Sequence, residues 1–247
     1  MDKTRLKTIF RKFMKWIYKA VILFIILSIV STILFRWIPV PVTPLMLIRV
    51  GQQAINGKEL RLWKDWTPLE DISPSMQLAV VVTEDQEYLR HSGFDLEAIK
   101  KAFKSNQRGK RKMRGGSTIS QQTAKNVFLW NGRNWIRKGL EVYFTMLIEI
   151  FWSKERILEV YLNIAEMGEG IYGVQAASKY YYGKDCSKLT KREAASIACI
   201  LPNPRKYSPT KPGSYIQKRI NWSLNQMRMW GGQLDFEGYG PGHENDE

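Results

Sequence analysis

An acidic pair, Glu84-Asp85, is separated by one threonine from an apolar run that ends in three valines at 80–82, and His91 lies seven residues beyond Glu84. A carboxylate held against valine side chains should have a raised pKa, which suits a general acid or base. The same pair could instead be ordinary polar residues at the end of a helix. Glu84 is therefore a candidate catalytic group that also has a plain structural explanation.

A second carboxylate, Glu141, lies in a mostly apolar segment over residues 137–152, which also contains Glu149. Arg137 stands four residues before Glu141, so an ion pair between successive helical turns is the ordinary explanation. The sequence suggests no role for Glu149. Two carboxylates in a helical domain nevertheless favour glycosidic chemistry, in which such groups move protons or stabilise developing charge.

A strongly basic run lies between these two carboxylates. Five cations occur within residues 108–114 and lead into Gly115-Gly116-Ser117, where a helix is predicted to begin. Most runs of this kind are solvated surfaces. A helix N-terminus with small residues is also a natural seat for phosphate, and Lys125 and Arg133 add positive charge further along. These residues are candidates for binding a phosphorylated ligand.

The composition limits what kind of protein these groups belong to. The chain has 247 residues, 44% hydrophobic and 25% charged, which suits one folded domain with appendages. Two cysteines, Cys186 and Cys199, cannot form a disulfide scaffold, and two histidines leave too few ligands for a typical structural zinc site. The net charge of +15 predicts an anionic partner: nucleic acid, a membrane surface or a phosphorylated substrate.

The N-terminal segment favours the membrane among these partners. Residues 20–35 carry no charge, and flanking aromatic and apolar residues extend the span to 16–38, which Pro39 ends. Seven basic residues and one acid in the first nineteen predict a cytoplasmic tail over 1–15 and a transmembrane anchor over 16–38. A cleaved signal peptide is the alternative, but the apolar run is long and no small-residue cleavage site follows. With the rest of the chain outside the cytoplasm, nucleic acid is not an expected partner, and lipid phosphates or diphosphate-linked substrates are.

Beyond the anchor the pattern is mostly helical. Residues 39–74 contain five prolines and are predicted to form a membrane-proximal connector with short local structure. The run 76–91 is compatible with a buried helix or strand by periodicity alone, and a helix is favoured. The chain beyond the anchor has no strong pattern of alternating strands and no internal repeat, so the predicted class is all-α. Further helices are predicted over 94–103, 117–129, 135–152, 154–167, 174–182, 191–201 and 215–230.

Four segments have the order and spacing of the motifs of the peptidoglycan glycosyltransferases, and the chain resembles that family. They are residues 84–93, 114–126, 137–141 and 156–163. Tyr88 is a departure, because the family usually has Phe there. The resemblance covers roughly residues 70–205, and with the anchor it is to the monofunctional biosynthetic transglycosylases of glycosyltransferase family 51. No transpeptidase domain is expected, because the chain has no Lys-Thr-Gly motif and only 36 residues follow a chance S-x-x-K match that ends at Lys211.

The resemblance implies a lysozyme-like, all-α glycosyltransferase domain over 75–247, with its motif core over 75–205 and a small lobe near the membrane. It implies that Glu84 is the general base when lipid II is polymerised into β-1,4-linked strands by inverting displacement of undecaprenyl diphosphate. Glu141 would be a second catalytic acid and a candidate ligand of Mg²⁺ or Mn²⁺, and no organic cofactor is implied. The residues implied in substrate binding are Asp85, His91, Arg114, Ser117, Thr118, Gln122, Lys125, Asn126 and Arg133.

The implied partners are lipid II, the growing glycan strand, membrane lipids and other proteins of cell-wall synthesis or division. The implied location is the inner membrane, with the catalytic domain on its outer side. Two other functions are open from the residues themselves. A lytic transglycosylase or lysozyme would need a carboxylic acid but not the cations at Arg114, Lys125 and Arg133, so this set argues against it. A membrane-tethered glycan-binding scaffold would need neither Glu84 nor Glu141.

Overall fold

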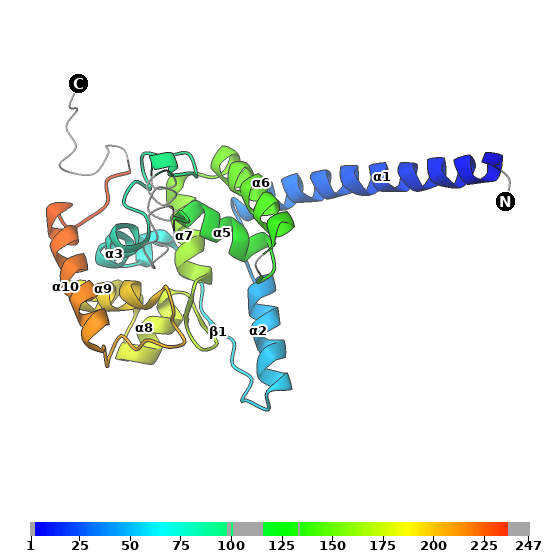
Figure 1. Cartoon of the computed structure of the whole chain (residues 1–247). Coiled ribbons are helices and arrows are strands. Elements are labelled where there is room, and N and C mark those ends of the chain that lie inside the picture. The colour runs from blue at the N-terminus through cyan, green and yellow to red at the C-terminus, as the bar shows by residue number, and fades with distance from the viewer. Residues whose placement is uncertain (1–2, 98–99, 101–115, 133, 237–247) are drawn as a thin grey trace, which may run out of the picture. The chain divides into compact units, whose positions relative to one another are not determined.

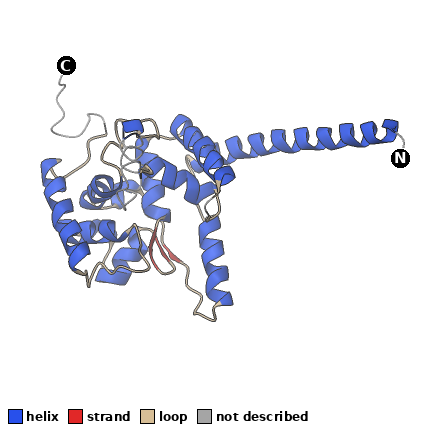
Figure 2. Cartoon of the chain, viewed as in Figure 1, coloured by secondary structure: helices blue, strands red, loops and turns tan. Residues whose placement is uncertain are grey.

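The computed structural model describes residues 3–97, 100, 116–132 and 134–236. The chain separates into two units, residues 1–38 and 39–247. Helices dominate both units, as Figure 2 shows. The all-α prediction is therefore confirmed.

The first unit is a single helix, α1 (Lys3–Phe35). Its segment Phe10–Phe35 is long and apolar enough to cross a bilayer, and its 26 residues extend about 39 Å at 1.5 Å per residue. The helix ends three residues before the predicted limit at Ile38. Three hydroxyl groups interrupt the apolar run, but each donates to a backbone carbonyl within about one turn, which removes the cost of an unpaired donor in hydrocarbon. They belong to Ser28, Ser31 and Thr32.

The helices of the second unit follow most of the predicted segments. They are α2 (Pro44–Ile55), α3 (Pro74–Glu84), α5 (Ile119–Phe128), α6 (Trp135–Phe151), α7 (Lys154–Ile164), α8 (Val174–Tyr182), α9 (Lys191–Ile200) and α10 (Ser214–Met229), with 3-10 turns at Leu69–Asp71 and Cys186–Lys188. The run 76–91 is helical in its first part and leaves the helix after Glu84. Much of the predicted helix 94–103 lies outside the described residues.

The helix predicted over 154–167 is shorter than expected. It ends at Ile164, because Ala165 adopts extended backbone with ψ 134° and the chain continues as a strand. A small sheet that the sequence did not predict has the order β1 (Trp63–Lys64), β3 (Ile171–Tyr172), β2 (Glu166–Gly168). β1 is parallel and β2 antiparallel to β3. Strands of two and three residues are too short to show alternation of apolar and polar side chains.

The end of α3 is the point where two packing groups meet. The segment 78–82 of α3 is fully buried, and α3 packs against α9 and α10, while α5 packs against α6 and α7 (Figure 1). A capping box between Thr118 and Gln121 fixes the start of α5 beside the end of α3. Cys186 and Cys199 lie in the same core as free thiols, and burial raises the pKa of each to about 11.

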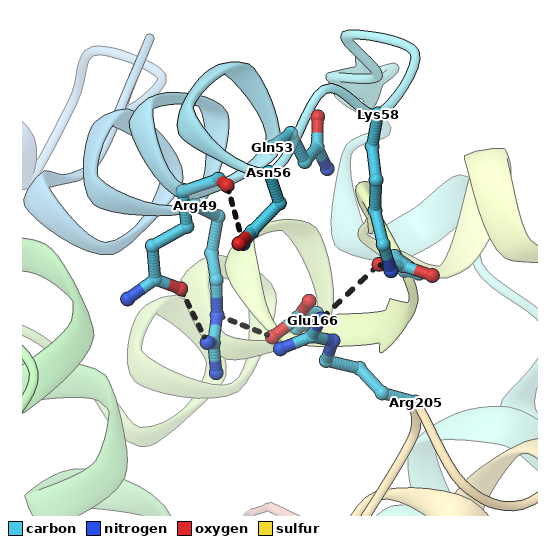
Figure 3. Close-up of a pocket in the computed structure, with 8 residues that line it drawn as sticks. Arg49, Gln53, Asn56, Lys58, Glu166 and Arg205 are labelled. Carbon is cyan, nitrogen blue, oxygen red and sulfur yellow. Dashed lines mark hydrogen bonds and ion pairs between the residues drawn. The ribbon is translucent and has the colours of Figure 1, made fainter.

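A small pocket of about 100 Å³ lies between α2 and the hairpin of β2 and β3, and charged side chains line it (Figure 3). Arg49 Nε lies 3.3 Å from Oε2 of Glu166. The Oε1 atom of Glu169 lies 2.7 Å from Lys58 Nζ and 3.1 Å from Arg205 Nη2. Burial raises the pKa of Glu166, and the charges of Arg49 and Arg205 lower it. The charged side chains that line this small space are already paired with one another, so we interpret the contacts as an attachment of α2 rather than as a ligand site.

Candidate active site

Glu84 is the last residue of α3, and it is half-buried. Its Oε2 atom accepts a hydrogen bond of 3.0 Å from Nε2 of Gln122 on α5. Burial raises the pKa of Glu84; the Gln122 hydrogen bond and the charge of Arg219 lower it, Asp85 raises it and Lys125 lowers it. The net direction is upward, so this carboxylate holds a proton more readily than one in water, as a general base requires.

Gln122 positions the Glu84 carboxylate. The Tyr161 hydroxyl on α7 donates to Oε1 of Gln122 at 3.3 Å, and this bond turns the amide NH₂ group toward Glu84. Tyr161 is buried, and burial followed by the charges of Glu84 and Asp85 raises the pKa of its phenol well above the ordinary value. Tyr161 therefore stays a protonated donor, which keeps the amide in this orientation.

Asp85 and His91 lie inside the protein and are paired with each other. Nε2 of His91 lies 2.9 and 3.1 Å from the two carboxylate oxygens of Asp85. The N–H of Gly93 donates to Nδ1 at 3.1 Å, and because an amide N–H can only donate, Nδ1 accepts and Nε2 carries the proton. Oδ2 of Asp85 also accepts from the N–H of Ile119, the first residue of α5, at 2.9 Å. The structure thus gives this pair a positioning role, because it holds the N-terminus of α5 against the end of α3.

The other residues of the second motif take different positions. The Thr118 hydroxyl is buried, donates to the carbonyl of Gly93 at 2.7 Å and accepts from the N–H of Gln121 at 3.1 Å. Ser117 is exposed immediately before this cap, and Asn126 is buried in α5. Of these residues, Ser117 has the side chain most open to a ligand.

A cluster of cations surrounds Glu141 on α6. Its Oε2 atom lies 2.7 Å from Nη1 of Arg137, and its Oε1 atom lies 2.5 Å from Nζ of Lys138. The Arg137 contact is the ion pair between successive turns that the spacing allows. Burial lowers the pKa of Lys125 on α5, and Glu141 raises it. Two further predicted cations, Arg114 and Arg133, lie outside the described residues, as do 108–113.

Lys125 connects the two carboxylates. It follows Gln122 by three residues on α5, and both Glu141 and Glu84 act on its charge. Lys125, Arg137 and Lys138 together outnumber the single charge of Glu141, so this cluster is net positive. Its member Lys125, together with Arg219, is also a positive charge that acts on Glu84. A proton acceptor next to fixed cations can deprotonate one group while it stabilises negative charge on another.

The residues around Glu141 do not fit a divalent cation in this arrangement. Mg²⁺ and Mn²⁺ need several oxygen ligands, with carboxylates free to coordinate them. Both oxygens of Glu141 are already engaged by Arg137 and Lys138. Within the described part of the chain, no three His, Cys, Asp or Glu side chains gather into a metal-binding group.

Arg219 is a site residue that sequence reasoning missed. It lies on α10, which packs against α3. Among the charged groups that act on Glu84, Arg219 has the largest effect, and it lowers the pKa of Glu84. It is half-buried and stands 135 residues after Glu84. One basic residue in a mostly polar helix carries no local signal, so only the packing of α10 reveals it.

A second layer of contacts supports the site and gives Glu149 a role. Glu149 Oε1 accepts a short hydrogen bond from the Ser120 hydroxyl and lies 2.9 Å from Lys154 Nζ. Lys154 Nζ also donates to the carbonyl of His91 at 2.6 Å. Gly93 has φ +86°, and a Cβ there would lie 2.9 Å from Cγ of Glu149, so glycine is required at this turn. The network braces the segment that carries His91.

A mostly helical domain that holds a carboxylate of raised pKa beside fixed cations has groups suited to glycosyl chemistry, in which a carboxylate moves a proton and cations stabilise developing negative charge. Residues 52–228 match the Transglycosylase family. Because the match covers most of the chain, this protein belongs to the transglycosylase family and is a glycosyltransferase.

Curated relatives support the same assignment. A protein of Pseudomonas putida named biosynthetic peptidoglycan transglycosylase is 50% identical over 214 residues, which are 87% of this chain and 90% of the relative. Proteins of the same name from Bdellovibrio bacteriovorus and Xanthomonas campestris are 51% and 48% identical, over 86% and 90% of this chain and 85% and 90% of their own lengths. The similarity therefore extends over most of this chain and over most of each relative.

Proposed function

We propose that this chain polymerises lipid II into the glycan strands of peptidoglycan, with Glu84 as the general base. One observation carries the proposal: the charge of Lys125 interacts both with Glu84, a carboxylate of raised pKa, and with the ion-paired cluster around Glu141. The first can take up a proton, and the second can receive a diphosphate. The names of the relatives support peptidoglycan as the product.

The reaction is a single displacement at the anomeric carbon of the lipid-linked donor. Glu84 takes the proton from the 4-hydroxyl group of the acceptor N-acetylglucosamine while that oxygen bonds to the anomeric carbon. The bond from this carbon to the diphosphate oxygen breaks, and its electron pair leaves with the undecaprenyl diphosphate. Attack from the opposite face converts an α linkage into a β-1,4 linkage. Gln122 keeps the Glu84 carboxylate aimed during the transfer.

Negative charge grows on the diphosphate as its bond to carbon breaks, so cations held there lower the energy of the transition state more than that of the bound substrate. Lys125, Arg137 and Lys138 fulfil this role among the described residues. Glu141 holds two of them by ion pairs of 2.7 and 2.5 Å and limits their mutual repulsion. This cluster distinguishes the proposed transferase from a lytic enzyme, which releases no diphosphate.

The location follows from the substrate and from the first unit. The seven basic residues in and before the start of the apolar segment Phe10–Phe35 support a cytoplasmic N-terminus, and in this orientation residues 39–247 would lie on the outer side of the membrane. Each CH₂ group of a polyprenyl tail contributes about 0.8 kcal/mol to the free energy of membrane binding, so the tail of the substrate stays in the bilayer. A single-pass enzyme of the inner membrane can therefore reach a substrate that is itself anchored there.

The test is an assay of the full chain in detergent with labelled lipid II, followed by gel analysis of the product. We expect glycan polymer that a muramidase digests, together with release of undecaprenyl diphosphate, and neither product from the Glu84→Gln variant. Preformed glycan serves as the second substrate. Fragments from this glycan without polymer from lipid II would establish the lytic alternative. No product from either lipid II or preformed glycan would favour the membrane-tethered glycan-binding scaffold.

A further inference from the structure

A second pocket, of about 540 Å³, is lined by residues in and next to β1 and by residues of α8. These two elements pack against each other (Figure 1), and they carry none of the residues placed around Glu84. Two aromatic rings line it, those of Trp63 on β1 and Tyr180 on α8, with centroids 5.7 Å apart and planes at 72°. Their exposed fractions are 49% and 47%. We call this pocket the aromatic groove; it is lined by residues 62–65, Ala176, Lys179 and Tyr180.

Both rings stand on elements that packing holds in place. The N–H of Trp63 donates to the carbonyl of Gly170 at 2.8 Å within the small sheet. The ring of Tyr180 lies 4.9 Å from that of Tyr181, whose hydroxyl donates to the carbonyl of Met167 at 3.0 Å. The groove is therefore formed before a ligand arrives, and binding would cost little ordering of its rings.

The chemistry of the groove matches a sugar. Exposed apolar surface with a polar rim is typical of ligand sites. Lys64, Asp65 and Lys179 form the rim, and the guanidinium of Arg61 lies 5.1 and 5.9 Å from the two ring centroids. A saccharide ring has apolar C–H faces that stack on aromatic rings and hydroxyl groups at its edge that need donors and acceptors. The groove offers both kinds of contact together.

The charge of the rim selects among saccharides. Of three nearby cations, two have a carboxylate partner: Arg61 Nη2 lies 3.3 Å from Glu59 Oε2, and Lys179 Nζ lies 3.3 Å from Asp65 Oδ2. Lys64 adds one net positive charge to the lining. The remaining positive charge favours a glycan that carries carboxylates over a neutral one. Peptidoglycan strands carry such carboxylates on their lactyl-linked peptides.

We propose that the aromatic groove is an accessory binding site for carboxylate-bearing glycan, which holds a segment of the peptidoglycan strand away from the reacting centre. The choice of peptidoglycan rests on the proposed function, whereas the saccharide chemistry rests on the groove alone. A strand held at a second site stays at a high effective concentration near the enzyme between additions.

The test measures binding of soluble, uncross-linked peptidoglycan fragments to the full chain in detergent by calorimetric titration, with an N-acetylglucosamine tetramer as the neutral probe. Trp63→Ala and Tyr180→Ala should each weaken the binding of both probes about tenfold, since stacked aromatic rings contribute on the order of 1 kcal/mol or more. Lys179→Glu should weaken only the carboxylate-bearing fragments. Trp222→Ala is the matched control, because Trp222 on α10 is 44% exposed and lies outside the groove.

Unchanged fragment binding by the Trp63 and Tyr180 variants would overturn the proposal. Equal losses in the Trp222 variant would also overturn it, because the effect would then not belong to the groove. In a parallel arm with anionic phospholipid vesicles, loss of vesicle binding with retained glycan binding would assign the groove to the membrane. The lipid II assay of the same wild-type preparation reports the proposed function separately, since fragment binding requires no turnover.

Discussion

Replacing Gln122 by methionine should move the acidic limb of the pH–rate profile of polymerisation to higher pH. The 3.0 Å hydrogen bond from Gln122 favours the charged form of Glu84 and lowers its pKa, so its loss raises that pKa and leaves less of the base deprotonated at low pH. Methionine has a similar volume but no N–H group. A hydrogen bond to a charged group contributes about 1.5–3 kcal/mol, which corresponds to roughly a ten- to hundredfold lower rate on the acidic limb.

The assay is kcat/KM for lipid II across pH, because this parameter reports the ionisation of the free enzyme. Tyr161→Phe is the matched control: it removes the hydrogen bond on the far side of Gln122 but keeps the donor to Glu84, so its limb should move less. Arg219→Met should move the limb in the same direction as Gln122→Met but by less, because the Arg219 charge acts less strongly on Glu84. A limb that stays in place while the plateau falls would refute the reasoning, since Gln122 would then act on the substrate and not on the base.

Five other variants test the remaining assignments. Glu84→Gln keeps a side chain that can accept from Gln122, so the protein should fold normally while polymerisation falls by roughly 10²-fold or more; near wild-type turnover would remove Glu84 as the base. Lys125→Ala should lower turnover, with only partial recovery in Lys125→Arg because the two cations differ in shape and hydration; a loss confined to melting temperature would mean a structural role. Glu141→Gln should lower the free energy of unfolding by about 3 kcal/mol, since two cations lose a buried counter-charge. Glu141→Gln should also move the alkaline limb of the pH–rate profile to lower pH, because burial lowers the pKa of Lys125 and the opposing effect of Glu141 disappears. An unchanged alkaline limb would mean that Lys125 is not the group whose deprotonation causes it. Deletion of residues 1–38 should leave a folded second unit, and its co-sedimentation with anionic liposomes at low salt would show that this unit has a membrane contact of its own.

Local sequence patterns predicted most of the helices because each pattern acts within a few residues. Apolar spacing gives the inner face of α6, and the Thr190–Glu193 capping box marks the start of α9 in the structure. The same locality explains the failures. Strands as short as Trp63–Lys64 have no period to detect. α7 stops at Ile164 because Ala165 is extended and the next residues form a hairpin with β3, which in turn pairs with the distant strand β1. Residues 39–74, which were predicted to be a connector with short local structure, contain α2, β1 and a 3-10 turn.

The sequence by itself determined the class of the protein, the apolar helix that is long enough to cross a membrane and the residue types that could do the chemistry, because these depend on composition, spacing and motif order. Only the tertiary structure decided what each residue does. The packing of α10 against α3 brings Arg219 to Glu84, and hydrogen bonds join the end of α3 to α5, where Gln122 donates to Glu84 and the N–H of Ile119 donates to Asp85. The direction of a pKa shift depends on burial and on charges within a few ångströms, and both arise from segments that are up to 135 residues apart in the chain.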